Sequence, residues 1–175
     1  STIHTNSASG AIPRFVSMPR VMAIFDLSYL YYPELFKQKD LHQLVHWTRY
    51  SARHAAHIIT ISEFSKRAIM GEYKVPEERI TVVYPGITEL RTQNSMTKFA
   101  NKYILSVGTI QPRKNYVRLI EAFSRLDSNV DLIIVGKKGW LYDEILSAPK
   151  RLGVENRVKF LDFVPDEDLP GLYKN

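Results

Sequence analysis

Two neighbouring basic residues in the segment SVGTIQPRKN, residues 106–115, are the strongest candidates for chemistry in this sequence. Gly108 allows a sharp exit from a preceding strand, and Arg113 and Lys114 stand where the next helix is expected to start. Because a helix N-terminus favours anions through its N–H groups and its dipole, two cations there would make a site for a phosphate or diphosphate. The alternative from the residues alone is a solvated basic pair in a loop.

A second glycine-bearing loop occurs in IVGKKGW, residues 134–140, where Gly136 and Gly139 bracket Lys137 and Lys138. The spacing matches neither a P-loop nor GxGxxG. A glycine turn with exposed lysines is one interpretation. A GxxG loop with basic central residues is also typical of KH RNA-binding modules, where it joins two helices. The β-branched run before Gly136 argues against that arrangement, so a KH-like RNA-binding module is kept only as an alternative.

Four histidines are expected on one side of a single helix, and they are His42, His46, His54 and His57. A rise of ~1.5 Å per residue puts the first and last about 22 Å apart, so all four cannot share one metal ion. No carboxylate accompanies either close pair at matching spacing. We therefore interpret them as polar-face residues and expect no metal site.

The charge of the chain is positive but evenly spread. Its 175 residues carry 24 Lys and Arg against 18 Asp and Glu, a formal net charge of +6, and no cysteine. A nucleic-acid binder usually concentrates basic residues in a stripe, so we expect no nucleic-acid partner. The charge fits an anionic small ligand, an anionic lipid surface or plain solubility. The apolar runs are far shorter than the ~18 residues of a membrane span.

Short apolar runs alternate with helical stretches along the chain. The predicted strands are Val21–Phe25, Ile58–Ile61, Ile80–Tyr84, Tyr103–Val107, Asp131–Val135 and Arg157–Leu161. The predicted helices are Leu41–His57 capped by Asp40, a helix capped by Ser62 and running to Tyr73, Tyr116–Leu126, Trp140–Leu152 with Pro149 kinking or ending it, and one from Asp166 onward. Residues 1–20 and Asp26–Pro33 are predicted as loops.

This alternation predicts an α/β fold with parallel sheets covered on both faces. The pattern restarts after an aperiodic stretch, so we predict two α/β domains, residues 1–92 and 102–175, with a linker at 93–101. Ligands of open parallel sheets lie at the carboxyl ends of the strands. We therefore expect Gly108, Arg113, Lys114 and Gly136 to face one cleft.

Six stretches together resemble, in order, motifs of the family 4 retaining glycosyltransferases, above all the branch with bacterial O-antigen mannosyltransferases. They are FDLSYLYYPELF (25–36), ARHAAHIITISEFSKRAI (52–69), VPEERITVVYPGI (75–87), YILSVGTIQPRKNYVRLIEAF (103–123), LIIVGKKGWLYDEI (132–145) and RVKFLDFVPDEDLPGLY (157–173). The resemblance implies a GT-B fold of two Rossmann-like domains, both incomplete here. The first would handle the acceptor and the second the nucleotide sugar.

The resemblance also implies roles for individual residues. Lys114 and Arg113 would hold the donor diphosphate and stabilise it as it leaves. The other implied donor-binding positions are Gly108, Thr109, Gly136, Lys137 and the base-lining pair Phe163 and Val164, and the implied acceptor-side positions are Phe25 and Asp26.

The implied substrates are a nucleotide sugar, GDP-mannose, and a glycan or lipid-linked glycan acceptor. The family needs no cofactor and no essential metal. The resemblance implies a cytoplasmic enzyme, with peripheral contact at the inner face of the cell membrane.

Some positions depart from the family pattern. Phe25 stands where relatives usually have His, Thr109 stands where some have Arg, and Asp162 stands where Gly is frequent. The E-x7-E carboxylate pair of the family would lie beyond Asn175. We therefore expect the chain to be part of a longer protein and inactive alone, and an inactive transferase remains a second alternative.

Overall fold

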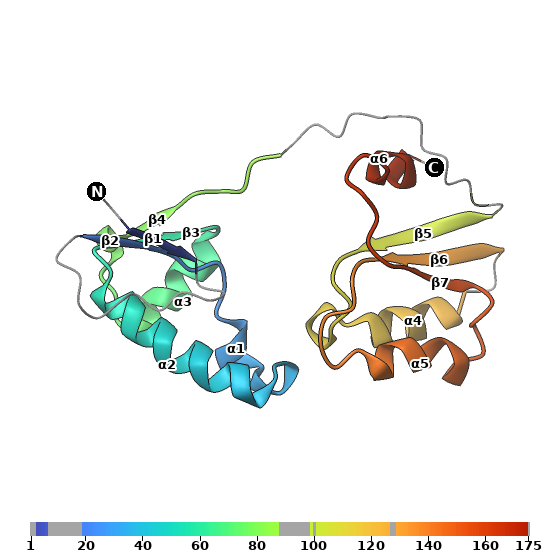
Figure 1. The fold of residues 1–175 in the computed structure, drawn as a ribbon, viewed down its shortest axis with the longest axis horizontal. Helices are drawn as coiled ribbons and strands as arrows, with labels where there is room; N and C mark the ends of the chain where they lie inside the picture. Colours follow the sequence, from blue (N-terminus) through green and yellow to red (C-terminus); the bar gives the residue numbers. More distant parts are fainter. Residues whose placement is uncertain (1–2, 7–18, 88–98, 100, 127–128, 175) are drawn as a thin grey trace. The chain divides into compact units, whose positions relative to one another are not determined.

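The computed structural model divides the chain into two compact units, Ser1–Ile87 (unit 1) and Thr88–Asn175 (unit 2) (Figure 1). The structure describes residues 3–6, 19–87, 99, 101–126 and 129–174. Apart from Phe99 and Asn101, the predicted linker at 93–101 lies outside the described residues. Each unit carries one parallel sheet with its own helices.

Unit 1 contains a sheet of four parallel strands in the order β1-β2-β3-β4. Its strands are β1 (Ile3–Asn6), β2 (Arg20–Ala23), β3 (His57–Thr60) and β4 (Ile80–Val82). Its helices are α1 (Ser28–Tyr31), α2 (Gln38–His54), α3 (Glu63–Tyr73) and the short 3₁₀ turns η1 (Pro33–Leu35) and η2 (Glu77–Arg79).

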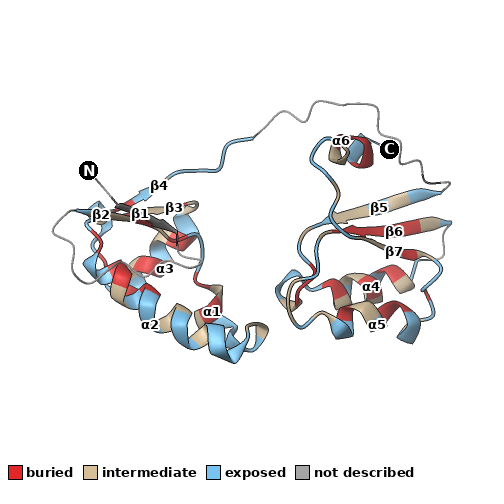
Figure 2. Ribbon diagram, viewed as in Figure 1, coloured by how far each residue is buried: buried red, intermediate tan, exposed pale blue. Residues whose placement is uncertain are grey.

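The helices of unit 1 share one apolar core with the sheet. Met22 of β2 and Ile58 of β3 pack in the same buried cluster as Tyr29 of α1, Ala52 of α2 and Ile69 of α3 (Figure 2). Burial of such aliphatic and aromatic side chains is what holds helices of this length on a sheet. The core thereby fixes where the loops after β2 and β3 emerge.

Unit 2 contains a sheet of three parallel strands in the order β5-β6-β7. Its strands are β5 (Lys102–Val107), β6 (Val130–Val135) and β7 (Val158–Leu161). Its helices are η3 (Pro112–Lys114), α4 (Tyr116–Ser124), α5 (Asp143–Arg151) and α6 (Leu169–Lys174).

The central strand of unit 2 is buried on both faces, as its continuous apolar run predicts. Leu132 and Ile134 pack with Ile120 of α4 on one face, and Ile133 packs with Leu172 of α6 on the other. Figure 1 shows α4 and α5 together on one side of the sheet and α6 on the opposite side. The predicted fold class is confirmed.

Several predicted boundaries are wrong, each because of pairing or turn geometry. Strand β1 lies within the predicted loop 1–20, where pairing with β2 makes a strand from a polar sequence. The segment Asp26–Pro33, also predicted as a loop, contains α1. Helix α2 starts at Gln38, because the N–H of Asp40 already donates to the carbonyl oxygen of Lys37 (3.0 Å).

The other end of α2 and the bounds of two further helices also differ from the prediction. Helix α2 stops at His54, since Ala55 is extended and leads into β3, so His57 belongs to a strand. Helix α5 starts at Asp143 rather than Trp140 and ends at Arg151, just past Pro149, as the proline predicts. Helix α6 starts at Leu169 rather than Asp166, after a turn whose carbonyl acceptor is Pro165.

Candidate functional site

The loops after β5 and β6 are joined to each other by backbone hydrogen bonds. Gly108 N–H donates to Val135 O (2.8 Å), Ile110 N–H donates to Lys137 O (2.9 Å), and Gly139 N–H donates to Ile110 O (2.9 Å). The ladder between the two parallel strands therefore continues past their carboxyl ends. Both loops are therefore held in place by main-chain groups.

Gly136 lies where the two loops come into closest contact. A Cβ at Gly136 would overlap the carbonyl oxygen of Gly108, and its φ of +151° is one that residues with side chains rarely adopt. The same Gly108 carbonyl accepts a hydrogen bond from the buried Tyr116 hydroxyl (2.8 Å). Burial raises the pKa of Tyr116, so this group stays a neutral donor.

Lys114 lies against this contact between glycines. It ends η3, and Asn115, in the left-handed conformation (φ 57°), is the N-cap residue that leads directly into α4. A methyl group at Gly108 would lie 3.6 Å from Cε of Lys114, so the lysine stem covers Gly108. The structure thus brings Gly108, Gly136 and Lys114 together beside the first turn of α4. Their role in binding a diphosphate stays a prediction.

Arg113 and Thr109 complete the loop after β5, and both are exposed. Arg113 lies on η3 next to Lys114. The methyl group of Thr109 lies over Gly139, where a Cβ would come within 2.8 Å of it. Thr109 therefore shapes the contact between the loops.

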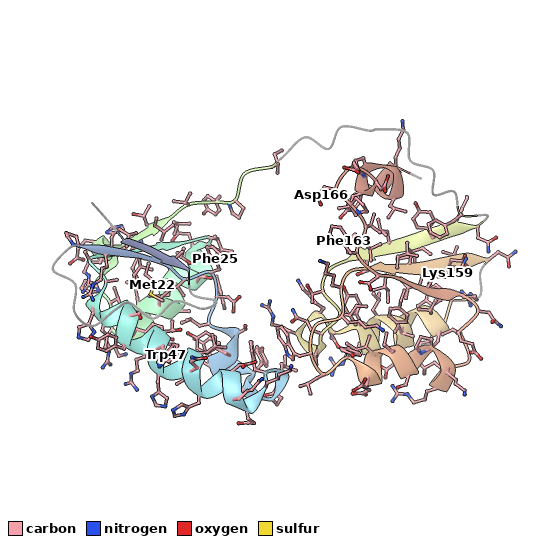
Figure 3. The ribbon with its side chains drawn as sticks, in the orientation of Figure 1. Met22, Phe25, Trp47, Lys159, Phe163 and Asp166 are labelled. Atoms are coloured by element: carbon pink, nitrogen blue, oxygen red, sulfur yellow. The ribbon has the colours of Figure 1, made fainter. Side chains whose placement is uncertain are left out.

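The third strand end adds an aromatic ring to the same edge. The Lys137 ammonium lies 4.6 Å from the centroid of the Phe163 ring, and Phe163 is 60% exposed (Figure 3). Val164 instead packs with Ile133 and Leu172 in the core on the α6 side. Of this predicted base-lining pair, Phe163 is therefore the residue that presents its ring to solvent.

The loop Gly136–Gly139 joins strand β6 to helix α5. A KH loop joins two helices, so the alternative of a KH-like module does not hold for this fold.

The histidines make local contacts. The rings of His42 and His46 lie 4.3 Å apart, and His57 Nε2 lies 2.8 Å from Thr81 Oγ1. Among the described residues no group of three His, Cys, Asp or Glu side chains is placed to hold a metal ion. Independence from metal stays a prediction.

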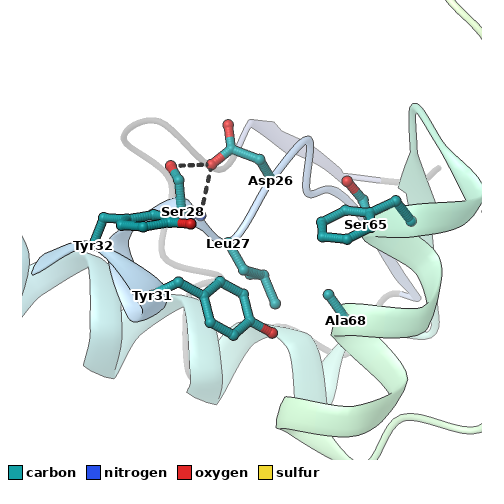
Figure 4. Close-up of a pocket in the computed structure, with 8 residues that line it drawn as sticks. Asp26, Leu27, Ser28, Tyr31, Tyr32, Ser65 and Ala68 are labelled. Carbon is teal, nitrogen blue, oxygen red and sulfur yellow. Dashed lines mark hydrogen bonds between the residues drawn. The ribbon is translucent and has the colours of Figure 1, made fainter. Parts of the chain in front are cut away.

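The predicted acceptor-side residues follow the carboxyl end of β2 in unit 1. Asp26 Oδ1 accepts hydrogen bonds from the N–H (2.9 Å) and the hydroxyl (2.5 Å) of Ser28, which fixes the start of α1 (Figure 4). The Phe25 ring is 40% exposed, and its carbonyl accepts from the Ser65 hydroxyl (2.8 Å). The segment after β2 is thereby tied to α3.

Beside Asp26 lies a pocket of about 490 Å³ that the sequence reasoning missed (Figure 4). It is lined by Asp26, Leu27, Ser28, Tyr31, Tyr32, Phe64, Ser65 and Ala68. The signal available in the sequence was the run of tyrosines after the first apolar strand. The contribution of α3 was invisible there, because it depends on how α3 packs beside α1.

Two family models together match nearly the whole chain. The model of Glycosyltransferase Family 4 matches residues 1–89, and that of the Glycosyl transferases group 1 matches residues 91–175. The boundary between the two matches lies close to the boundary between units 1 and 2.

Two curated relatives are O-antigen mannosyltransferases. The chain is 30% identical to O-antigen chain mannosyltransferase B of Escherichia coli, over 79% of this chain and 38% of that protein. It is 26% identical to O-antigen chain mannosyltransferase RfbU of Salmonella typhimurium, over 88% of this chain and 42% of that protein. The chain therefore spans about two fifths of the length of these relatives.

A solved structure with a similar fold contains a nucleotide and a sugar. The crystal structure of Anabaena Alr3699/HepE in complex with UDP and glucose matches with a TM-score of 0.62 and 26% identity, over 86% of this chain and 43% of that one. None of the helices in the described part of this chain is long and apolar enough to cross a membrane.

Proposed function

The chain belongs to glycosyltransferase family 4, and from that premise we propose that the full-length protein moves a hexose, mannose, from a nucleotide sugar to a growing glycan. The proposed donor is GDP-mannose, and the proposed acceptor is a polysaccharide or a lipid-linked glycan. The reaction retains the configuration at the transferred carbon and uses no cofactor.

The observation that carries the proposal is the position of Lys114. Its stem lies over Gly108, next to the close contact between Gly108 and Gly136, and beside the first turn of α4. These features suit a diphosphate. The lysine cation and the N-terminus of α4 favour an anion, and the glycine backbone, which has no side chain, lets the anion approach closely. HepE, crystallised with UDP and glucose, supports a nucleotide-sugar donor.

The proposed chemistry is electrostatic. As the bond between the sugar and the diphosphate breaks, its electron pair moves onto the diphosphate, whose negative charge grows. Lys114, Arg113 and the dipole of α4 stabilise that charge, which lowers the barrier. The acceptor hydroxyl attacks the face from which the diphosphate leaves and gives its proton to an oxygen of that diphosphate, so no protein nucleophile is needed.

The relatives supply the reason for choosing mannose and a glycan acceptor. Both mannosyltransferases named above act, by their names, on O-antigen chains. Such acceptors suit an enzyme working in the cytoplasm at the inner face of the membrane, and we include that location in the proposal.

The test is donor turnover by the full-length protein. GDP-mannose and UDP-glucose are supplied with lipid-linked or free mannose oligosaccharides, and released nucleoside diphosphate is measured together with the anomeric configuration of the product. We expect turnover of GDP-mannose with retention. Turnover of UDP-glucose alone would contradict the proposed sugar, and turnover of neither donor would favour the inactive transferase that Phe25 suggests.

A further inference from the structure

We propose that Tyr116 is a positioning residue of the donor site. Its buried hydroxyl fixes the peptide between Gly108 and Thr109, so that the N–H of Thr109 is presented to the diphosphate of the donor. That this diphosphate belongs to a nucleotide sugar rests on the proposed function. The orientation of the peptide rests on the structure of the two loops alone.

The Tyr116 hydroxyl is bound to the end of β5, although its ring belongs to α4. The side chain is 2% exposed and packs in the core with Ile110 and Ile120. Its hydroxyl donates to Gly108 O (2.8 Å). Because the ring cannot move without opening the core, this hydrogen bond fixes the direction of the Gly108 carbonyl.

The direction of that carbonyl decides the direction of the next N–H. In a trans peptide the C=O and the N–H that follows it point opposite ways. A Cβ at Gly136 would overlap the oxygen of Gly108 but would lie 3.2 Å from the nitrogen of Thr109, so the oxygen is the atom turned toward Gly136. The Thr109 N–H therefore points away from β6, toward the side of β5 that pairs with no other strand in the described part of the chain.

The N–H of Thr109 has no hydrogen-bond partner among the described residues, unlike the N–H groups on either side of it. Gly108 N–H donates to Val135 O (2.8 Å), and Ile110 N–H donates to Lys137 O (2.9 Å). Thr109 itself is exposed. A free main-chain donor at the carboxyl end of a parallel strand lies where such sheets bind ligands, and it suits a phosphate oxygen.

Two side chains of different character meet at Gly108. A methyl group there would lie 3.6 Å from Cε of Lys114 and 3.2 Å from the hydroxyl oxygen of Tyr116. The Lys114 ammonium can reach a ligand because the residue is exposed, whereas the buried Tyr116 can act only through the peptide that it holds. A phenylalanine ring would fill the same space in the core, so the hydroxyl is the part that orients the peptide.

The test is Tyr116→Phe in the full-length protein, with Tyr103→Phe as the matched control. Tyr103 also donates to a main-chain carbonyl of unit 2, that of Leu172 (2.7 Å), but it lies near the start of β5. We expect Tyr116→Phe to weaken binding of inorganic pyrophosphate and to lower kcat with GDP-mannose, each on the order of 10-fold, the lower end of what a hydrogen bond to a charged group is worth. Tyr103→Phe should lose similar stability and keep both.

A direct readout is the amide signal of Thr109 in the NMR spectrum of protein with isotope-labelled threonine, assigned by comparison with Thr109→Ser. Saturating pyrophosphate should shift this signal in the wild type and in Tyr103→Phe, because the N–H then donates to a phosphate oxygen. The shift should be much smaller in Tyr116→Phe, where the peptide is free to turn. A loss of stability alone would not separate the two tyrosine variants in this way.

Each result bears on the proposal. Failure of the wild type to bind pyrophosphate, or a Thr109 amide that does not move at saturation, would overturn it. Equal effects of Tyr116→Phe and Tyr103→Phe would also overturn it, since the hydroxyl would then serve only the stability of unit 2. A shift that depends on Tyr116, in a protein that turns over neither nucleotide sugar, would support the positioning role and count against the proposed function.

Discussion

Each unit has its own parallel sheet, and the segments that follow the carboxyl ends of the strands differ between the two units. In unit 2 the loops after β5 and β6 are paired through main-chain groups, contain glycines in close contact, and carry Lys114 and Lys137. In unit 1 the segments after β2 and β3 are tied by side chains, through the Ser65 hydroxyl and the Asp26 carboxylate, and expose aromatic rings.

The difference shows that one architecture can carry two kinds of surface at its strand ends. Backbone pairing and glycine bring main-chain groups close enough to meet an anion, and the cations add charge. In unit 1 the side-chain hydrogen bonds leave a pocket between α1 and α3. Substitutions should therefore act differently in the two units. Unit 2 should lose stability when a side chain is added at a glycine, and unit 1 should lose stability when a serine hydroxyl is removed.

The largest effect is expected for Lys114→Ala in the full-length enzyme. Removing an oriented donor beside a growing charge lowers turnover about 100- to 1000-fold, roughly 3–4 kcal/mol of barrier. The loss should fall on kcat more than on the KM for the acceptor, because the charge develops only as the bond breaks. Steady-state kinetics with GDP-mannose measures both.

Lys138→Ala is the matched control for that change. Lys138 is exposed on the neighbouring loop, and its ammonium lies 5.7 Å from the Tyr142 ring. Its removal should change turnover little. Near-wild-type rates for both variants would remove Lys114 from the donor site and reduce the comparison to one of loop structure.

Gly136→Ala should destabilise unit 2 by about 3 kcal/mol. The added Cβ overlaps the carbonyl of Gly108 and requires a backbone conformation that costs about 1–3 kcal/mol by itself. Because the overlap is with the main chain, no rotamer change relieves it. Hydrogen exchange of peptides from β5 and β6 should rise, while peptides of unit 1 stay protected.

Gly71→Ala adds a Cβ at a glycine of unit 1 that has no close contact. Gly71 lies inside α3, and a Cβ there would meet nothing within 4 Å. Alanine is the better helix former by about 1 kcal/mol, so this variant should stabilise unit 1 slightly. Equal destabilisation by both glycine substitutions would mean that the close contact at Gly136 is not what distinguishes the units.

The sequence was most informative where local pattern and tertiary structure agree. The continuous apolar run of β6 predicted a buried central strand, and Gly108 and Gly136 were placed correctly at strand ends because glycine marks such turns. The start of α6 and the strand β1 were missed, since one depends on a turn at Pro165 and the other on pairing with β2.

The candidate sites divide in the same way. The basic loop was readable because its residues are consecutive in sequence. The pocket of unit 1 was not, because Tyr31 and Phe64 are far apart in the chain and meet only through the packing of α1 beside α3. The family resemblance pairs Val164 with Phe163 at the base, and in the fold the Phe163 ring is exposed while Val164 packs with Ile133 and Leu172. Their role at the base stays a prediction.

Asp131→Asn should cost unit 2 about 2 kcal/mol at pH 7. The carboxylate is 3% exposed and accepts a hydrogen bond from the Lys159 ammonium (2.7 Å), a charged contact of about 1.5–3 kcal/mol. That hydrogen bond holds the pKa of Asp131 below its usual range. Its stabilisation is therefore present above the ordinary pKa of about 3.9 and is lost as the pH falls below it.

Urea unfolding at pH 7 and pH 3, followed by hydrogen exchange in each unit, checks the prediction. The difference between Asp131→Asn and the wild type should shrink at pH 3. Glu77→Gln is the control in unit 1, where Glu77 pairs with Lys66 (2.9 Å) and its side chain is 67% exposed. Such a surface pair is worth at most about 1 kcal/mol. A pH-independent loss in Asp131→Asn would assign the effect to packing.

The smallest effect is expected for Ser62→Ala, which probes the side-chain ties of unit 1. Ser62 caps α3, and its hydroxyl oxygen accepts from the Ser65 N–H (3.1 Å). Loss of such a cap costs about 1 kcal/mol. Donor turnover at saturating acceptor should stay near that of the wild type. Ser62→Asp restores a capping acceptor and should recover stability. Full stability in Ser62→Ala would show that unit 1, like unit 2, fixes its loops through the main chain, and the contrast between the two edges would then be one of ligand chemistry alone.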